Sequence, residues 1–455
     1  MSTSQAPLPV SSIGNETGLR RQLTAGQMAM LAVGGSIGTG LLLGSGAAIN
    51  IAGPAVVLSY VIGAAIAFTV TMALGEMASA HPAAGSFGVY AELYLNDWAG
   101  FVARYGYWFA VVIAVGGELV AAATYMRVWF PNTAPVVWII VFAALLLVIN
   151  LRPVKDYGTF EYWFAMVKVI TIAAFILIGA ALLLSKRAPA QYNVSGGFFP
   201  HGASSPLLAA SFALFSFLGI EFVAIASGEA KSPASVARAT RIMFALLALL
   251  YIGATAVLVG VMPWTQAGVV QSPFVTVFQI AGIPAASLLM NVVVLTAALS
   301  GANANIFAAG RMLFSLARSG YAPAALGRLT GGGSPHVALS LSAIGILVAI
   351  LTQTYAPEGA YLYIIGASLF GGMLAWWITL AAHINFRKRF PADQLAQLPL
   401  HAPGGRVLST FGFVALMAAI GSTWFVPQTR ITVVSGPFYL FLLTIGYFFV
   451  RRAKQ

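Results

Sequence analysis

The sequence predicts an all-α polytopic membrane protein with twelve transmembrane helices. Of its 455 residues, 60% are hydrophobic and only 7% are charged, whereas soluble domains carry about 25% charged residues. A chain with so few charges cannot cover a soluble surface, so most of it must face lipid. Apolar windows of about 20 residues, the length that spans the hydrocarbon core, recur along the chain. Glycine, proline and charged residues separate them.

Twelve of these apolar windows are expected to form the helices. They cover roughly residues 27–50, 54–75, 99–126, 134–151, 161–184, 205–227, 241–262, 285–309, 337–355, 360–384, 407–426 and 432–450. No short apolar segment with a small-residue cleavage site precedes the first window, so no signal peptide is expected. The first window itself is expected to direct insertion into the membrane.

The basic residues are distributed unevenly between the two sides of the expected membrane. With a cytoplasmic N-terminus, eighteen of the 23 Lys and Arg residues fall in cytoplasmic segments, four fall outside and Lys168 lies within a span. Because cytoplasmic segments carry an excess of basic residues, this bias predicts that both termini are cytoplasmic. It also explains the net charge of +12 without a nucleic-acid partner. The basic tracts at 387–389 and 451–454 are expected to contact membrane lipid at most.

The residue types exclude several kinds of chemistry. The chain has no cysteine, so disulfides, thiol catalysis and cysteine metal sites are excluded. Its five histidines fall in loops or near span ends, and no pair has metal-ligand spacing. No span carries a cluster of His, Asp or Glu, or a nucleophile with a base, so a membrane enzyme is not expected. Neither a metal nor another cofactor is expected.

Two of the windows contain an interruption of the helical pattern. The first window contains the run Gly34-Gly35-Ser36-Ile37-Gly38-Thr39-Gly40, and the sixth contains Phe215-Ser216-Phe217-Leu218-Gly219-Ile220-Glu221. The sixth window comes five windows after the first, so the two start on opposite sides of the membrane. Matching interruptions in inverted halves indicate a transporter's midplane site. Residues 38–40 are therefore expected to be an unwound binding segment, whereas Gly44 and Gly46 are expected to serve close helix packing.

Five stretches carry a family resemblance, in the right order along the chain. They are AVGGSIGTGLLLGSGAAINIAGPAVVLSYVIG, ALGEMASAHPAAGSFGVYAELYL, EYWFAMVKVITI, FSFLGIEFVAIASGEAKSP and VVLTAALSGANANIFAAGRMLFSLARSG. The chain resembles the bacterial amino acid permeases of the amino acid–polyamine–organocation superfamily from about residue 18 to 390, and more weakly to its end. The resemblance implies a bacterial inner-membrane protein with two inverted five-helix repeats and two peripheral helices. The expected divisions are a cytoplasmic tail over 1–26, repeats over 27–200 and 201–390, and helices 11 and 12 with a short tail over 391–455.

The resemblance also implies a site for free amino acids at the two interruptions. A zwitterion needs partners for both of its charges in a dry site. The Thr39 hydroxyl and the N–H groups around Gly40 would hold the carboxylate at the positive end of a half-helix. The ammonium would be held by the carbonyls of Ser36, Phe215 and Leu218, with the Phe215 ring as a lid. The other site residues expected in the two interruptions are Ile37, Gly38, Ser216 and Gly219.

Charged residues within the spans are the candidates for ion coupling, because they are costly in a membrane. Lys168 matches the lysine that, in proton-coupled relatives, points into the place of a cation between helices 1 and 8. The alternative is a structural, snorkelling lysine. Glu118 could contact the substrate, relay a proton or balance Lys168. Glu221 could shuttle protons or tie helix 6 to its neighbours. At span ends, Glu76 and Glu229 are expected in ion pairs or a gate.

Two amides in the eighth window, Asn303 and Asn305, depart from the serine or cysteine that is frequent in the family. They could line the cleft between helices 1 and 8 or bond across helices. Taken together, the sequence predicts secondary active amino acid import by alternating access, with proton symport and neutral substrates favoured. Amino acid exchange and cationic substrates facing Glu118 are alternatives, and a nutrient sensor or a channel are alternatives of another class. The oligomeric state does not follow from the sequence.

Overall fold

The computed structural model describes residues 19–150, 154–185, 190–194, 196–269, 271–282, 284–355, 360–427 and 429–454. Within these ranges the regular structure is helical, apart from one isolated bridge between Leu23 and Ala230. Most of the expected N-terminal tail lies outside the described residues, as do Arg152, Lys186 and Arg187 from the charge analysis.

The α-helices follow the expected windows closely. They are α2 (Ala25–Ser36), α3 (Thr39–Leu42), α4 (Gly44–Ala52), α5 (Val56–Ala80), α6 (Ser86–Tyr94), α7 (Asp97–Met126), α8 (Pro135–Asn150), α9 (Val154–Leu184), α10 (Ser205–Phe217), α11 (Phe222–Ile225), α12 (Pro233–Val261), α13 (Pro273–Ile280), α14 (Pro284–Arg318), α15 (His336–Ser342), α16 (Ile344–Tyr355), α17 (Ala360–Arg389), α18 (Ala392–Ala396), α19 (Arg406–Ser422) and α20 (Arg430–Lys454). Short 3-10 turns are η1 (Gly53–Ala55), η2 (Ala226–Glu229), η3 (Trp264–Gln266), η4 (Ala324–Gly327) and η5 (Thr423–Phe425).

Eleven helical stretches of the described chain are long and apolar enough to cross a membrane. The remaining expected window, residues 134–151, corresponds to α8. Its described part has 16 residues, about 24 Å at a rise of 1.5 Å per residue, and ends at Asn150, where the described range also ends. The sequence therefore predicted twelve spans, of which eleven have full length within the described residues.

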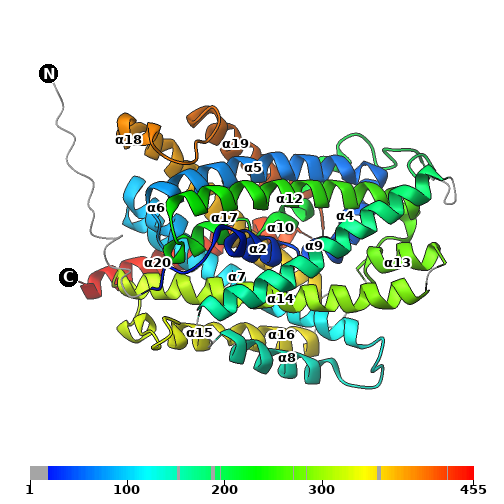
Figure 1. The fold of residues 1–455 in the computed structure, drawn as a ribbon, viewed down its shortest axis with the longest axis horizontal. Coiled ribbons are helices and arrows are strands. Elements are labelled where there is room, and N and C mark those ends of the chain that lie inside the picture. The colour runs from blue at the N-terminus through cyan, green and yellow to red at the C-terminus, as the bar shows by residue number, and fades with distance from the viewer. Residues whose placement is uncertain are drawn as a thin grey trace.

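The long helices run side by side along the long axis of the molecule (Figure 1). Helix α7 packs most extensively against α14 and α17, and both α10 and α12 pack against α5. Helices α8, α15 and α16 lie along the lower edge of Figure 1, and α18 and α19 along its upper edge. This arrangement places α7 where it can contribute side chains to a site shared with α14 and α17.

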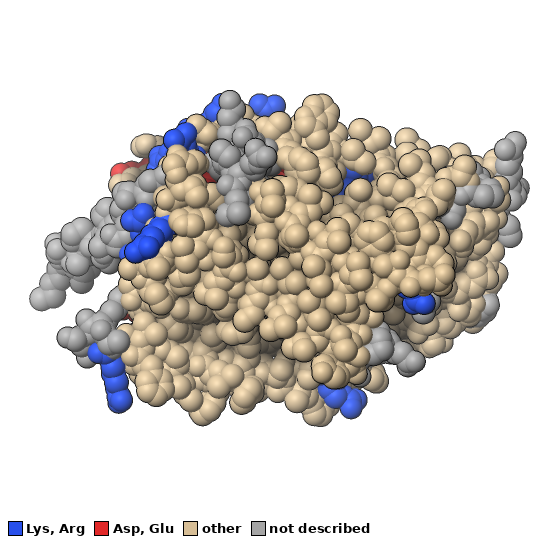
Figure 2. Space-filling view, turned by 90° about the horizontal axis from the view of Figure 1, so that it is seen from below, with Lys and Arg blue, Asp and Glu red and all other residues tan. Residues whose placement is uncertain are grey.

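The surface around the middle of the molecule is apolar. Figure 2 shows almost only uncharged residues there, with most of the visible Lys and Arg gathered toward the end at which the chain terminates. Large hydrophobic side chains are exposed on this surface, including Leu177 at 71%, Leu249 at 69% and Phe449 at 69%. An exposed apolar surface of this extent is the signature of a protein that contacts lipid.

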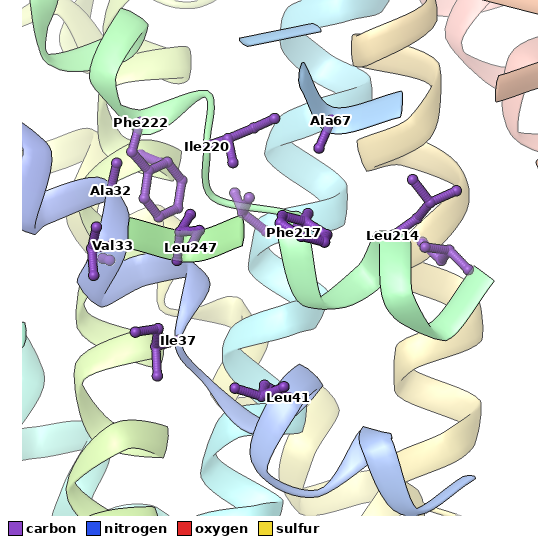
Figure 3. Close-up of a cluster of buried hydrophobic side chains, with 14 of the residues drawn as sticks. Ala32, Val33, Ile37, Leu41, Ala67, Leu214, Phe217, Ile220, Phe222 and Leu247 are labelled. Atoms are coloured by element: carbon purple, nitrogen blue, oxygen red, sulfur yellow. The ribbon is translucent and has the colours of Figure 1, made fainter. Parts of the chain in front are cut away.

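Helices in two windows are interrupted where glycine falls in the sequence. The helix of the first window stops at Ser36 and resumes at Thr39, and the helix of the sixth stops at Phe217 and resumes at Phe222. The prediction that residues 38–40 are unwound is therefore correct only for Gly38, because Thr39 and Gly40 already form the first turn of α3. Figure 3 shows both interruptions, with Ile37 on the non-helical segment after α2 and Ile220 on the turn after α10. A Cβ on Gly219 would lie 2.8 Å from the Ser36 nitrogen, so the two interruptions are in direct contact.

His81, the residue after α5, gives a pH-dependent contribution to stability. It contacts the rings of Tyr94, Phe386 and Phe390, and burial lowers the pKa of His81 from 6.5 to about 4. The folded state therefore binds fewer protons than the unfolded state between these two values. Its contribution is complete above pH 6.5 and is lost as the pH falls toward 4.

We expect acidification from pH 7 to pH 5 to lower the free energy of unfolding by on the order of 1–2 kcal/mol through His81. A His81→Phe variant should lack this part of the pH dependence. Thermal unfolding of both proteins in detergent at pH 7, 6 and 5 measures it. Identical pH dependence in the two proteins would contradict the assignment to His81.

Candidate functional site

A buried cavity lies between the two interruptions. Its walls come from both of them and from α7, α14 and α17, and are formed by Gly35, Ser36, Gly38, Gly40, Tyr107, Ala110, Val111, Ala114, Glu118, Phe215, Leu218, Gly219, Glu221, Asn305, Ser368 and Gly372. The cavity measures about 40 Å³, which is room for a few water molecules. An amino acid would enter only if side chains such as Phe215 move.

The structure brings most of the predicted site residues to this cavity. Those that line it are Ser36, Gly38, Gly40, Glu118, Phe215, Leu218, Gly219 and Glu221. The other four predicted residues are buried behind its wall. Ile37 lies in the first interruption, and Thr39 begins the helix that follows it. The Ser216 hydroxyl bonds the Phe212 carbonyl and the Tyr60 hydroxyl. Lys168 bonds the Ile37 carbonyl of the first interruption.

Glu118 occupies the N-terminal end of α3. Both of its carboxylate oxygens lie 3.3 Å from the Thr39 nitrogen, which donates to them. A Cβ on Gly38 would come within 2.4 Å of Glu118 Oε1, and one on Gly301 within 2.9 Å. Glycine at both positions therefore makes room for the carboxylate. An anion at a helix N-terminus is stabilised by the free N–H groups there, so Glu118 sits next to the place predicted for the substrate carboxylate.

Three polar groups of the two interruptions are available to a ligand in the cavity. Among the described residues, the Gly40 N–H has no acceptor and the Leu218 carbonyl has no donor. The Ser36 hydroxyl is buried without a partner. The Ser36 carbonyl, predicted to bind the ammonium, is already occupied, since it accepts from Tyr251 Oη at 2.6 Å and from the Gly38 nitrogen at 2.9 Å.

Gly40 is constrained by packing as well as by its place in the cavity. A Cβ on Gly40 would lie 3.0 Å from both Cδ1 of Phe215 and Cα of Ser216. A larger side chain at this position would push against the α10 backbone at Ser216 as well as narrow the cavity. Gly46 allows close packing, as expected, because a Cβ there would lie 1.8 Å from the Gly268 oxygen.

Gly219 holds the second interruption in a conformation that other residues disfavour. Its φ is +112°, and a Cβ would lie 2.6 Å from Ser36 Oγ. We expect Gly219→Ala to lower the free energy of unfolding by about 1–3 kcal/mol, through backbone strain and the clash with the first interruption. Thermal unfolding measures this, with Gly421→Ala as the matched control because nothing lies within 4 Å of a Cβ there. Equal stability of the two variants would show that the contact between the interruptions is loose.

Lys168, on α9, is 1% exposed and lies against the first interruption. Its Nζ donates to the Gly34 carbonyl, to the Ile37 carbonyl at 3.0 Å and to Ser300 Oγ of α14 at 2.9 Å. The ammonium is thus coordinated between the interrupted helix and α14, the eighth window. Carbonyl and hydroxyl oxygens are also the ligands of hard cations, so the lysine fills a place suited to a positive charge.

Glu221 ties the second interruption to two other helices. Its Oε1 accepts from Tyr107 Oη at 2.5 Å and from the Gly219 nitrogen at 3.1 Å, and its Oε2 accepts from Trp376 Nε1 at 2.9 Å. These donors come from α7, the interruption itself and α17. Of the two roles considered for Glu221, the geometry favours the tie between helices.

Two further acids form ion pairs at the ends of spans, as expected. Glu76 Oε2 lies 2.7 Å from Arg387 Nε and 2.6 Å from His383 Nε2. Glu229 pairs with Arg311 at 2.9 Å rather than with its sequence neighbour Lys231. Within the described ranges, no group of three or more His, Asp or Glu could hold a metal ion.

Sequence reasoning missed several residues of this region. Tyr107, Trp376 and Tyr251 bond the interruptions, but each lies on a different helix, and no spacing in the sequence connects them with the site. Glu161 was also missed, although a signal was present. It precedes Lys168 by seven residues, which puts the two on the same face of α9, two turns apart.

Comparisons with known proteins identify the family of this chain. The profile of the family described as amino acid permease matches residues 27–455. The chain is 36% identical over 452 residues to the aromatic amino acid transport protein AroP of Escherichia coli strain K12, covering 96% of this chain and 97% of that protein. It is 35% identical over 445 residues to the probable threonine/serine transporter YbxG of Bacillus subtilis strain 168, covering 96% of each. It is 32% identical over 448 residues to the gamma-aminobutyric acid permease of the same organism, covering 97% of this chain and 95% of that protein.

The chain therefore belongs to the amino acid permease family. It is a multi-pass membrane protein that transports amino acids, and it is not an enzyme.

Proposed function

We propose that this permease imports neutral amino acids together with protons by alternating access. The observation that carries the proposal is the position of Lys168, whose ammonium is coordinated by the first interruption and by Ser300. A buried ammonium can give up its proton when its surroundings change. Since Lys168 holds the carbonyls of Gly34 and Ile37, loss of that proton would release the segment that binds the substrate.

The substrate backbone is proposed to bind between the interruptions. The Gly40 N–H, at the start of α3, is free to donate to the substrate carboxylate, and the Leu218 carbonyl is free to accept from the ammonium. The Ser36 hydroxyl supplies a further polar contact. Phe215 lines the cavity and is partly exposed, which suits a lid that moves as substrate enters.

Neutral substrates are proposed because most of the remaining wall is small or apolar. Ala110, Val111, Ala114 and Gly372 face the cavity together with the two carboxylates Glu118 and Glu221. Glu221 is satisfied by its three donors, and similar proteins are described as carriers of aromatic amino acids, of threonine or serine, and of gamma-aminobutyric acid. A cationic substrate facing Glu118 is the alternative.

The proposed setting is the cytoplasmic membrane of a bacterium, with both termini inside. The bias of Lys and Arg along the chain supports this orientation, as does their concentration toward one end of the molecule (Figure 2). The two interruptions five windows apart support a pair of inverted five-helix repeats over 27–200 and 201–390. The helices after residue 390 would then be peripheral.

Purified protein in liposomes tests the proposal. Labelled phenylalanine, threonine, γ-aminobutyrate and lysine are offered under an inward proton gradient, under an inward sodium gradient, or with unlabelled amino acid inside and no gradient. We expect a proton gradient to drive accumulation of a neutral amino acid. Uptake that needs internal amino acid and ignores the proton gradient would reject symport in favour of exchange. Accumulation of lysine alone would reject neutral substrates, and no accumulation of any amino acid would favour a sensor or a channel.

A further inference from the structure

A second buried acid is joined to Lys168 through a single hydroxyl group. Ser300 Oγ accepts a hydrogen bond from Lys168 Nζ at 2.9 Å and donates its own proton to Glu161 Oε1. Glu161 is fully buried, Lys168 is 1% exposed and Ser300 is 2% exposed. An ammonium, a hydroxyl and a carboxylate thus form a continuous donor-to-acceptor chain between α9 and α14.

The carboxylate of Glu161 is held in place from its other side. Asn303 Nδ2 donates to Glu161 Oε2 at 3.0 Å, and Asn150 Nδ2 donates to Asn303 Oδ1 at 2.6 Å. Asn150 lies on α8, and its carbonyl accepts from Ser334 Oγ at 3.1 Å. An amide does not carry a proton as readily as a carboxylate or a hydroxyl. We therefore assign Asn303 and Asn150 the role of orienting Glu161.

The first interruption also makes room for Glu161. A Cβ on Gly34 would come within 2.5 Å of Glu161 Oε1 and 3.2 Å of the Ala165 Cβ. The Gly34 carbonyl meanwhile accepts from Lys168 Nζ. Gly34 is thus the point where the interrupted helix contacts both ends of the chain from Lys168 to Glu161. Movement of this helix would change both contacts together.

The charges around Glu161 are few. Lys168 on the same helix interacts with Glu161 electrostatically, and the hydrogen-bond donors from α14, Ser300 and Asn303, are uncharged. The next acid, Glu118 of α7, interacts electrostatically with Lys168 from the side of the cavity. Lys168 therefore lies between one acid at the substrate cavity and one acid away from it.

We propose that Glu161 is the group that takes the proton from Lys168 on the side away from the substrate. This inference rests on the proposed function, because it requires that Lys168 carries the coupled proton. In the step, an N–H bond of Lys168 breaks and its proton goes to Ser300 Oγ, while the Ser300 hydroxyl proton goes to Glu161 Oε1. The lysine becomes a neutral amine, the carboxylate becomes a carboxylic acid and Ser300 is regenerated.

The position of Glu161 along α9 gives the step a direction. Glu161 lies seven residues after Val154, the first described residue of α9, which is about 10 Å along the helix axis. Lys168 lies about 10 Å further from that end. With the proposed orientation, α9 begins on the cytoplasmic side. A proton on Glu161 is therefore nearer to cytoplasmic water than a proton on Lys168, and it is released there when alternating access opens that side.

Net uptake and exchange separate this role from a structural one. During net uptake, the empty carrier must lose its proton inside before it returns. During exchange, the loaded carrier returns with its proton, so no proton has to leave Lys168. We expect Glu161→Gln in liposomes to lose at least about tenfold of proton-driven uptake of labelled phenylalanine, threonine or γ-aminobutyrate. Exchange of the same amino acid should stay within about threefold of wild type.

Ser300 and a matched control complete the experiment. Ser300→Ala, which lacks the bridging hydroxyl, should behave like Glu161→Gln, and Ser300→Thr should restore net uptake. Thr171→Val on the same helix should leave both activities unchanged, since the Thr171 hydroxyl bonds only Val167 O of its own helix. Equal loss of net uptake and exchange in Glu161→Gln would mean a structural role and overturn the proposal, as would full net uptake.

The outcome for the wild type separates this inference from the proposed function. If wild-type uptake ignores the proton gradient, the proposed symport itself fails. If the wild type is proton-driven and depends on Lys168, but Glu161→Gln and Ser300→Ala both retain net uptake, only the role of Glu161 fails.

Discussion

Replacing Lys168 with alanine should lower proton-driven amino acid uptake by at least about tenfold, equivalent to about 1.4 kcal/mol or more. The variant loses the group proposed to carry the proton, together with its bonds to the Gly34 and Ile37 carbonyls and to Ser300. Initial rates of labelled uptake into liposomes with an inward proton gradient measure the effect.

Lys231→Ala is the matched control for this experiment. Lys231 is exposed, and it is its backbone N–H that donates to the Leu23 carbonyl, so its side chain should be dispensable. Thermal unfolding shows whether the Lys168 variant is folded. If folded Lys168→Ala protein keeps full gradient-driven uptake, Lys168 has a structural role only.

The second large effect is expected for Glu118. Glu118→Ala leaves the buried Thr39 N–H without its carboxylate partner, and an unpaired buried donor costs about 1–3 kcal/mol. It also removes the side chain that fills the space between Gly38 and Gly301. We expect the start of α3 to be less well fixed and transport of every substrate in the panel to fall by at least about tenfold.

Thr124→Ala on the same helix is the control, because the Thr124 hydroxyl bonds the Val120 carbonyl of its own helix. A comparison of substrates then separates the roles open for Glu118. Loss of lysine uptake alone would mean that Glu118 binds a cationic side chain. Unchanged uptake of all substrates in Glu118→Ala would contradict a role at the site.

The interruptions could be predicted from the sequence because their causes are local. Glycine at 38 and 219 marks the positions at which the helices stop, and the structure places the breaks at residues 37–38 and 218–221. Lys168 and Glu118 could be singled out for a similar reason, since a charge inside an apolar window needs an explanation. These are properties of single positions, so a single sequence carries them.

The partners of the site residues could not be predicted in the same way. Glu221 meets Tyr107 and Trp376, which are 114 and 155 residues away in the chain. These contacts depend on how α7, α10 and α17 pack, and the local pattern of hydrophobic residues does not predict which helices pack together. The same holds for Tyr251, whose hydroxyl occupies the Ser36 carbonyl predicted to hold the substrate.

Glu161 could have been predicted from its spacing to Lys168. Two ionisable residues seven positions apart on one buried helix face form a pattern within a single window, and each is costly alone. Their connection through Ser300 still required the packing of α9 against α14.

The most direct test of the account follows protons and amino acid together. Wild-type protein is reconstituted with a pH-sensitive dye inside the liposomes, and labelled amino acid is added outside without any imposed gradient. We expect entry of the amino acid to acidify the interior and Lys168→Ala to abolish this acidification. Entry of amino acid into wild-type liposomes with no change in internal pH would contradict it.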